Sequence, residues 1–281
     1  MNTANPPLLD VQNLKVRFRM STGIVEAVRG LSFSLGRERL GIVGESGSGK
    51  SQTGRAILGL TPPPGEMEAD KLQFDGIDLL KADYKTLCSI RGGRIAMVMQ
   101  DPKYSLNPVM TIGNQIVEAY RAHCRATKAE GREKALDMLE AVQIRDPQRV
   151  FNQYPHEISG GMGQRAMIAM MLVTDPDLLI ADEPTSALDV TVQAEVLRIL
   201  DKLVAERGMG LIFISHDLPL VSAFCNRVIV MYAGKVVEEI SASDLAHAKH
   251  PYTQGLLRCL PKLKQDVRPL PILHRDPSWA L

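Results

Sequence analysis

The sequence has few cysteines, almost no excess charge and no long apolar run. Four cysteines occur in 281 residues, far apart and without a C-x-x-C pair, which argues against a zinc or iron–sulfur site. They are Cys88, Cys124, Cys225 and Cys259. Scattered free thiols are typical of a reducing compartment. A formal net charge of +1 gives no electrostatic reason to expect nucleic acid as the main partner.

The apolar segments are all short. None approaches the roughly 18–20 apolar residues that cross a bilayer. The first ten residues, MNTANPPLLD, lack the basic start and apolar centre of a signal peptide. We therefore expect a chain that does not cross a membrane by itself and would serve one only by docking on a partner. The hydrophobic fraction of 45% and charged fraction of 23% are those of an average globular protein, without internal repeats or low-complexity tracts.

Two kinds of strand are predicted. Apolar and polar residues alternate over 14–18 and over 31–35, which is typical of antiparallel strands buried on one face. Three later runs are continuously apolar, as in parallel strands buried on both faces, and each ends in polar residues. These runs are L-G-I-V at 40–43 before a glycine loop, L-L-I-A at 178–181 before Asp182-Glu183, and L-I-F-I at 211–214 before Ser215-His216. Ligands bind beyond the carboxyl ends of such strands.

The remaining segments frame this α/β pattern. Residues 110–155 have mostly helical periodicity and interrupt the α/β core, so we interpret them as an inserted subdomain. Residues 228–237 predict a hairpin around Ala233-Gly234. Prolines at 62–64 indicate a surface loop, and those near 269–271 a loose tail.

Residues 44–51 read G-E-S-G-S-G-K-S and match the phosphate-loop pattern G-x-x-x-x-G-K-[ST]. An apolar strand precedes the loop, and a helical segment follows it. Backbone N–H groups and the helix N-terminus would bind phosphates, Lys50 would reach the β- and γ-phosphates, and the Ser51 hydroxyl would bind Mg²⁺. The alternative is a chance glycine turn. The residues expected at the nucleotide are Gly44, Glu45, Ser46, Gly47, Ser48, Gly49, Lys50, Ser51 and Gln52.

Two acids, Asp182 and Glu183, end the strand at 178–181. Asp182 fits the residue that holds Mg²⁺, usually through water, and Glu183 fits a general base that polarises the attacking water. The D-E-P sequence is also turn chemistry, so a solvated turn is the alternative.

Residues 158–165, I-S-G-G-M-G-Q-R, run directly into an apolar helical segment. Adjacent glycines this close to a helix start suggest that a ligand approaches the backbone there. A helix with ordinary capping by Ser159 is the alternative.

The order of these motifs resembles one family, the ATP-binding subunits of ABC transporters. Lys50, then Gln100 in M-V-M-Q-D-P, Ser159 in S-G-G, Asp182, S-A-L-D at 186–189 and His216 in F-I-S-H-D follow one another as they do there. The match covers about residues 8–255. It implies an α/β fold with a P-loop NTPase core, a mostly parallel sheet, an N-terminal antiparallel β subdomain and an α-helical subdomain inserted at about 101–165. Residues 256–281 would form a short C-terminal extension.

The resemblance also implies how the site works. Two subunits would dimerise head to tail and enclose two ATP molecules, each bound to one phosphate loop and capped by the partner's Ser159, Gly160 and Gly161. Gln100 would sense Mg²⁺ and the γ-phosphate, His216 would contact the γ-phosphate, and Asp189 would reach across the seam. Taken alone, a histidine at a strand end is more often structural. Phe18 either stacks on adenine or belongs to the core.

Finer features resemble the peptide and nickel importer branch of that family. They are G-E-S-G-S-G-K-S-Q-T, D-P-K-Y-S-L-N-P after Gln100, Met162 in S-G-G-M, and H-P-Y-T-Q-G-L-L at 250–257. The clustered cysteines of many longer tails are absent here, and Gly163 replaces a common basic residue. Gly163 should loosen the helix start by up to ~1 kcal/mol relative to alanine. With Met162, it suggests that the two ATP sites are unequal.

On this interpretation the chain is the ATP-hydrolysing subunit of an importer, peripheral on the cytoplasmic face of the plasma membrane. Its partners would be a second ATP-binding subunit, two permeases and, indirectly, a solute-binding protein. The cargo would be peptides, or alternatively nickel.

Three competing functions are a soluble ABC ATPase acting on DNA or ribosomes, an inactive regulatory subunit, and half of an exporter. The single cassette without a coiled-coil insert argues against the first of these. The intact Lys50, Asp182, Glu183 and His216 argue against the second, and the lack of a fused transmembrane segment argues against the third.

Overall fold

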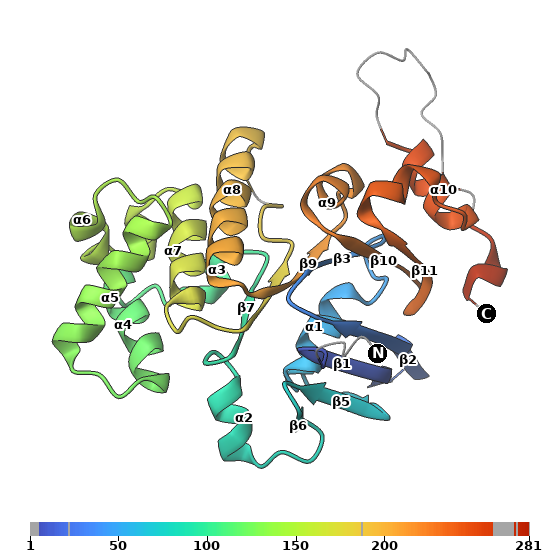
Figure 1. Cartoon of the computed structure of the whole chain (residues 1–281), viewed down its shortest axis with the longest axis horizontal. Coiled ribbons are helices and arrows are strands. Elements are labelled where there is room, and N and C mark those ends of the chain that lie inside the picture. The colour runs from blue at the N-terminus through green and yellow to red at the C-terminus, as the bar shows by residue number, and fades with distance from the viewer. Residues whose placement is uncertain (1–5, 22, 187, 261–272, 274, 281) are drawn as a thin grey trace, which may run out of the picture. The chain divides into compact units, whose positions relative to one another are not determined.

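The computed structural model describes residues 6–260 except 22 and 187, together with residues 273 and 275–280 (Figure 1). The chain forms two compact units, one from Met1–Leu80 with Ile212–Leu281 and one from Lys81–Leu211. Some sequence predictions lie outside the described residues. They concern the first five residues, Ala187 of S-A-L-D, the prolines near 269–271 and most of the 256–281 extension.

In the first unit an antiparallel sheet confirms the alternating pattern at the start of the chain. Its strands are β1 (Leu9–Met20), β2 (Gly23–Leu35), β4 (Gly65–Glu68), β5 (Lys71–Phe74) and β6 (Ile77–Asp78). The central strand β1 pairs antiparallel with β2, β4 and β5. Along β2, Leu31, Phe33 and Leu35 are buried, while the serines between them are exposed. The buried sides of β1, β2 and β5 supply the sheet with its core face.

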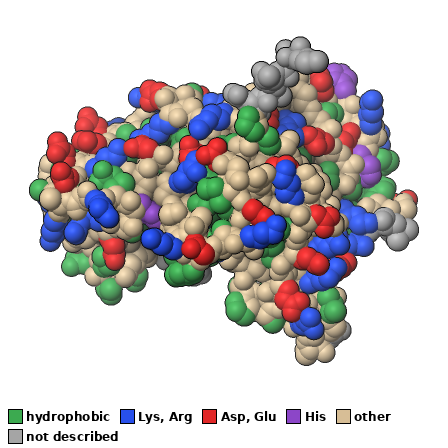
Figure 2. All heavy atoms as spheres, turned by 60° about the horizontal axis from the view of Figure 1, so that its bottom comes forward, with side chains coloured by type: hydrophobic (Ala, Val, Ile, Leu, Met, Phe, Trp, Pro, Cys, Tyr) green, Lys and Arg blue, Asp and Glu red, His purple; other side chains and the backbone are tan. Residues whose placement is uncertain are grey.

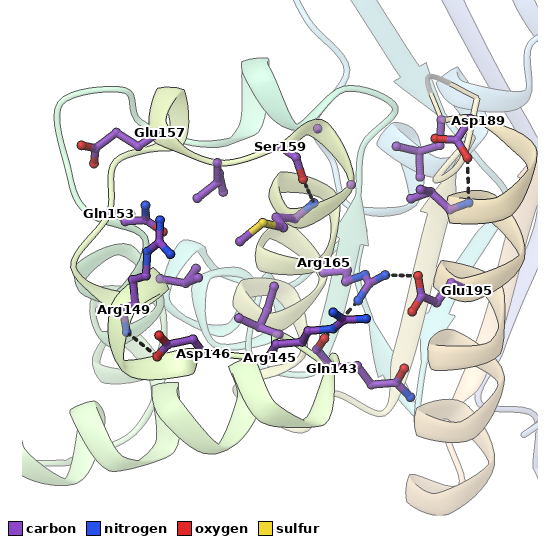
Figure 3. Close-up of a pocket in the computed structure, with 18 residues that line it drawn as sticks. Gln143, Arg145, Asp146, Arg149, Gln153, Glu157, Ser159, Arg165, Asp189 and Glu195 are labelled. Carbon is purple, nitrogen blue, oxygen red and sulfur yellow. Dashed lines mark hydrogen bonds and ion pairs between the residues drawn. The ribbon is translucent and has the colours of Figure 1, made fainter.

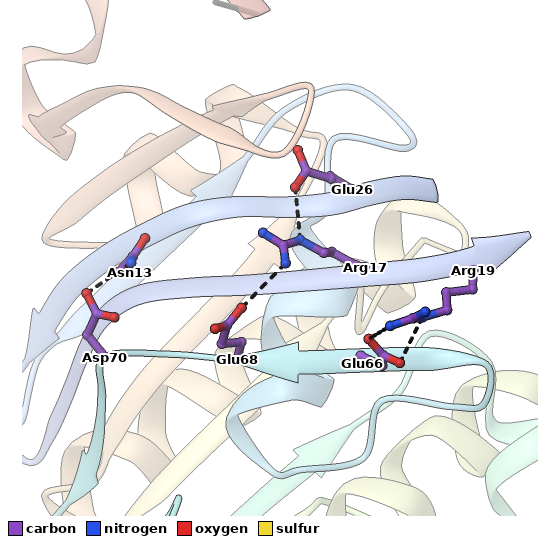
Figure 4. Close-up of polar contacts among 7 residues, drawn as sticks. All are labelled: Asn13, Arg17, Arg19, Glu26, Glu66, Glu68 and Asp70. Atoms are coloured by element: carbon purple, nitrogen blue, oxygen red, sulfur yellow. Dashed lines mark hydrogen bonds and ion pairs between the residues drawn. The ribbon is translucent and has the colours of Figure 1, made fainter. Parts of the chain in front are cut away.

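The exposed face of this sheet is covered with ion pairs (Figure 4). Arg17 on β1 lies 3.0 Å from the Glu26 carboxylate on β2 and 3.5 Å from that of Glu68 on β4. Arg19 makes a two-pronged contact with Glu66, at 3.0 and 3.2 Å. Because all these side chains are substantially exposed, we expect the pairs to favour strand register more than overall stability.

The same unit contains strands of the predicted parallel sheet. They are ordered β11 (Lys235–Ser241), β10 (Arg227–Tyr232), β3 (Arg39–Val43) and β9 (Gly210–Ser215), the last from Ile212 onward. β3 and β10 are parallel, whereas β10 and β11 form the predicted antiparallel hairpin, which turns at Ala233-Gly234. Four of the five residues of β3 and all of β9 are buried, in keeping with strands covered on both faces.

Helices complete the first unit. They are α1 (Lys50–Ile57), α9 (Leu218–Phe224) and α10 (Pro251–Arg258), with short 3₁₀ segments η2 (Ala242–His247) and η3 (Pro277–Ala280). The helix predicted after the phosphate loop is therefore confirmed as α1. Helix α10 begins within the H-P-Y-T-Q-G-L-L segment.

The second unit pairs two parallel strands with a group of helices. The strands are β7 (Ile95–Val98) and β8 (Leu178–Asp182), and every residue of β8 is buried. The helices are α2 (Tyr84–Ile90), α3 (Pro102–Ser105), α4 (Ile112–His123), α5 (Lys128–Ala141), α6 (Pro147–Phe151), η1 (Pro155–Glu157), α7 (Gly160–Leu172) and α8 (Val190–Arg207). The predicted helical subdomain limit near residue 165 falls inside α7.

Helices α4, α5 and α6 hold together around one aromatic ring. Phe151 of α6 lies against the backbone of Gly113 in α4, so closely that a Cβ on that glycine would be 2.1 Å from the ring. The guanidinium of Arg132 in α5 lies 4.3 Å from the centre of the same ring. Dispersion and cation–π attraction therefore join three helices at this point.

The surface agrees with the near-neutral composition. Over the face in Figure 2, Lys and Arg side chains are interspersed with Asp and Glu. Within the described part of the chain, no helix combines the length and the apolar character needed to cross a bilayer.

Candidate functional site

The phosphate loop connects β3, which ends at Val43, with α1, which begins at Lys50. Its conformation depends on glycine at both ends. Gly44 has a φ of 152° and a Cβ there would be 2.2 Å from the carbonyl oxygen of Met231. Gly49 has a φ of 101°, and a Cβ there would be 2.2 Å from the carbonyl oxygen of Ala27. Any other residue would strain the backbone and collide with a neighbouring strand.

Lys50 is the first residue of α1, and the residue is 5% exposed. Its Nζ donates hydrogen bonds to the carbonyl oxygens of Gly44, at 2.8 Å, and Glu45, at 2.9 Å. The ammonium group is thereby fixed over the loop. A phosphate oxygen would meet a positive charge already in place, without the cost of ordering a long side chain.

Further polar groups around the loop fit an anion. The N-cap residue of α1 is a glycine without a side-chain cap, so no side chain there satisfies the first N–H groups of the helix. The Ser48 Oγ is buried and has no hydrogen-bond partner among the described residues. The Gln52 Oε1 also has no partner among the described residues, but an amide oxygen only accepts hydrogen bonds, so it suits a cation or an N–H group rather than an anion. Ser46 and Gly47, by contrast, are exposed.

His216 and Phe18 also belong to the first unit. His216 is exposed and follows β9, next to β3 in the sheet. The next residue is held in place, because the Asp217 carboxylate caps α9 by accepting a hydrogen bond from the Leu220 N–H, at 3.0 Å. Phe18 is half-buried, and its ring lies beside Gly65 on β4. Partial exposure leaves both interpretations of Phe18 open.

In the second unit, Asp182 is the buried last residue of β8, and Glu183 follows half-buried. Glu183 adopts a φ of 47°, a left-handed conformation that is costly for a residue with a side chain. Gln164 of α7 supports this turn by donating from its buried Nε2 to the Pro184 carbonyl, at 2.5 Å. The sequence interpretation missed Gln164, whose position in the S-G-G-M-G-Q stretch was the available signal.

Gln100 lies near the same edge of the β7–β8 pair. The two strands run parallel with Val98 opposite Ala181, so Gln100 and Asp182 both follow the paired segment. Gln100 is exposed. The oxygen donors of Ser51, Gln100 and Asp182 are of the kind that Mg²⁺ prefers, so their chemistry fits this ion.

Ser159 begins α7 as its N-cap, and its Oγ accepts a hydrogen bond from the Met162 N–H, at 3.3 Å. Ser159 and Gly160 are exposed, and a Cβ on Gly160 would meet no atom within 4 Å. A Cβ on Gly161 would be 2.7 Å from Val192 of α8. Packing within this chain is therefore one reason for Gly161. Because the Ser159 O–H proton is not used in the cap, Ser159 can both cap α7 and donate to an anion.

A pocket of about 680 Å³ opens beside these residues (Figure 3). Ser159, Gly160 and Gly161 line it, together with Asp189. Asp189 is the N-cap of α8, and its carboxylate accepts from the Thr191 and Val192 N–H groups, at 3.1 and 3.0 Å. Arg165 lines the wall, where it is ion-paired with Glu195 and donates to the Gln143 carbonyl. The start of α7 thus faces an open space in its own unit.

Comparison with known proteins identifies the family to which this sequence belongs. The sequence model described as ABC transporter matches residues 28–186. A probable peptide ABC transporter ATP-binding protein of Sinorhizobium fredii is 50% identical over 257 residues, covering 90% of this chain and 77% of the relative. The dipeptide transport ATP-binding protein of Escherichia coli is 48% identical over 92% of this chain and 80% of its own length. The oligopeptide transport ATP-binding protein of Bacillus subtilis is 46% identical over 92% and 73%.

Solved structures agree. An ATP-binding cassette in a dimeric post-hydrolysis state, bound to ADP and Pi, superposes with a TM-score of 0.74 and 28% identity, covering 83% of this chain and 98% of that one. A subunit of an ABC transporter complex from Clostridium perfringens superposes with a TM-score of 0.72 and 25% identity, over 90% and 96%. The chain therefore belongs to the ABC transporter family, and it is one of that family's ATPases.

Proposed function

We propose that this chain is the ATP-hydrolysing subunit of a membrane importer for dipeptides or oligopeptides. The supporting observation is a formed phosphate loop with Lys50 in place, in a chain whose identity to peptide-transport ATP-binding proteins extends over most of its length. The buried Asp182 and strained Glu183 add the acidic groups that hydrolysis needs.

In this proposal the phosphate loop and Lys50 bind the triphosphate. Ser51, Gln100 and Asp182 would hold Mg²⁺, which when bound neutralises charge on the phosphates. Glu183 accepts a proton from the attacking water, and His216 orients that water. Phe18 stacks against adenine.

We further propose that the active form contains two ATP-binding subunits. Ser159, Gly160 and Gly161 of each would donate hydrogen bonds to the γ-phosphate held by the other, with Asp189 reaching across the seam. Loss of the γ-phosphate removes the shared contact, so the subunits part. Two permeases would convert that motion into alternating access, and a solute-binding protein would deliver the cargo. The chain would then be peripheral on the cytoplasmic face of the plasma membrane.

The decisive experiment is co-expression of a tagged chain with two peptide-importer permeases from the same genome. We expect both permeases to co-purify, and proteoliposomes containing the complex to take up a labelled dipeptide only when ATP is supplied on the ATPase side. Uptake of ⁶³Ni in place of the peptide would transfer the function to nickel import. Purification without any membrane subunit would favour a soluble ABC ATPase.

A further inference from the structure

Residues from the far C-terminal part of the first unit contact the start of the phosphate loop. The phenolic oxygen of Tyr252, on α10, accepts a hydrogen bond from the Glu45 N–H, at 3.0 Å. The guanidinium of Arg275 forms an ion pair with the Glu45 carboxylate, also at 3.0 Å. Figure 1 shows α10 and the C-terminal end near β10 and β11.

The first of these contacts fixes one peptide group from both sides. The N–H of Glu45 and the carbonyl of Gly44 belong to the same planar peptide, and in a trans peptide they point in opposite directions. Tyr252 accepts from the N–H, while Lys50 Nζ donates to the carbonyl, at 2.8 Å. The orientation of this peptide therefore sets where the Lys50 ammonium lies. Tyr252 has no part in the phosphate-loop motif, yet its phenolic oxygen is one of the two groups that hold this peptide.

Tyr252 is itself rigidly held. Its side chain is fully buried, and burial raises the pKa of its phenol to about 12, so the phenol stays neutral near pH 7. His250 caps α10 by accepting from the Tyr252 N–H, at 3.2 Å. The Glu238 carboxylate on β11 accepts from the Lys249 N–H, at 2.6 Å, just before this helix. Burial of the ring and capping of α10 therefore restrict the motion of the Tyr252 hydroxyl.

A short C-terminal segment, residues 275–279, covers Tyr252, and we name it the C-terminal latch. The ring of Trp279 lies 5.8 Å from that of Tyr252, 5.9 Å from that of Tyr232 and 6.1 Å from that of His250, measured between centroids. Arg275 brings the latch to the loop directly through Glu45. Trp279 is the single tryptophan of the chain, which makes it a specific fluorescent reporter of the latch.

We propose that Tyr252 is a positioning residue for the phosphate loop and that the C-terminal latch reinforces it through Arg275 and Trp279. The inference rests on the proposed function in one respect, that the loop binds ATP. It assigns the C-terminal extension a role in nucleotide affinity, exerted through the Gly44–Glu45 peptide. Tyr252 touches neither nucleotide nor metal in this scheme.

The test compares Tyr252→Phe with Tyr232→Phe in the full chain. Both changes delete one hydroxyl from the same aromatic cluster, and the structure gives the Tyr232 hydroxyl no hydrogen bond among the described residues. We expect the dissociation constant for a fluorescent ATP analogue to rise about tenfold in Tyr252→Phe, because the half-buried N–H of Glu45 loses its partner. Tyr232→Phe should bind like the wild type.

Further readouts separate positioning from general instability. In the assembled transporter, Tyr252→Phe should raise the KM for ATP and leave kcat nearly unchanged, since the lost contact acts on the loop rather than on the reacting atoms. Arg275→Gln, an exposed change that does not endanger folding, should weaken binding about twofold, and Arg275→Lys should restore part of the loss. Trp279 emission should shift in Tyr252→Phe and in Arg275→Gln.

The outcomes are distinguishable. Wild-type affinity in Tyr252→Phe, or equal losses in both phenylalanine variants, would overturn the inference and leave the proposed function intact. If Tyr252→Phe fails to fold, unchanged affinity in Arg275→Gln overturns it. A wild-type chain that binds no ATP would overturn the proposed function and this inference together.

Discussion

Glu183 combines an unfavourable backbone conformation with a carboxylate at the end of a buried strand. With a φ of 47°, it occupies a region that costs a side-chain-bearing residue roughly 1–3 kcal/mol. The Glu183 carbonyl accepts from the Ser186 N–H, at 3.3 Å, which closes the turn. Such strain persists where the surrounding structure over-determines it, and Gln164 on the Pro184 carbonyl contributes to that here.

Replacing Glu183 with glutamine should separate binding from hydrolysis. The amide keeps the side-chain size but cannot accept the proton of the attacking water, so we expect phosphate release to fall by about 10²–10⁴-fold while ATP binding persists. Phosphate release by the assembled transporter measures this. Glu206→Gln on α8, where Glu206 makes an exposed contact with Lys202, is the matched control and should leave turnover unchanged. Near-wild-type turnover in Glu183→Gln would remove Glu183 from its assigned role.

At the scale of elements, the effect of a helical glycine on stability depends on whether a side chain would have room at its position. Gly113 and Gly163 both lie in the first turn of a helix, α4 and α7. A Cβ on Gly113 would collide with Phe151, whereas a Cβ on Gly163 would be 3.8 Å from Pro102, an ordinary contact. The sequence interpretation expected Gly163 to loosen its helix. The structure offers no steric reason for that glycine.

The same substitution should therefore have opposite effects at the two positions. Gly113→Ala overpacks the Phe151 site and should destabilise the chain by about 1–3 kcal/mol. Gly163→Ala should stabilise it by up to about 1 kcal/mol through helix propensity. Urea unfolding of the two variants against the wild type checks both signs. An unchanged midpoint for Gly113→Ala would contradict the packing seen around Phe151.

Most elements were predictable because their patterns are local. The alternation over 31–35 and the continuous apolar runs at 178–181 and 211–214 predicted two kinds of strand, and the structure confirms both. The order of apolar and polar residues along a strand reflects whether one face or both faces are buried. The start of α7 at Gly160 was predictable from Ser159. The apolar segment after Arg165 continues to Val173, just before Asp175-Pro176, and α7 extends to Leu172 along it, so the predicted subdomain limit near 165 lies within this helix.

At the scale of the whole molecule, the two compact units divide the predicted site residues. The phosphate loop and His216 belong to one, and Gln100, Asp182, Glu183 and Ser159 to the other. The proposed dimer requires Ser159 to meet a nucleotide on another subunit, which gives a test independent of catalysis.

In Glu183→Gln, ATP should drive association of two subunits, because hydrolysis no longer removes the shared γ-phosphate. Light scattering after gel filtration should show twice the monomer mass with MgATP and the monomer with MgADP. Adding Ser159→Arg should abolish the dimer by placing a bulky side chain at the seam. If the natural partner is a different ATPase, only the mixture with that subunit should associate. Absence of ATP-dependent association in both preparations would refute the dimer.

The sequence by itself determined the family, the phosphate loop and the order of the site motifs, because these depend on residue types at fixed short spacings. Only the tertiary structure decided that Tyr252 holds Glu45, that Val192 occupies the space beside Gly161 and that Gln164 supports Pro184. These contacts join residues far apart in the chain. Their existence depends on how strands and helices pack, and no local periodicity records it.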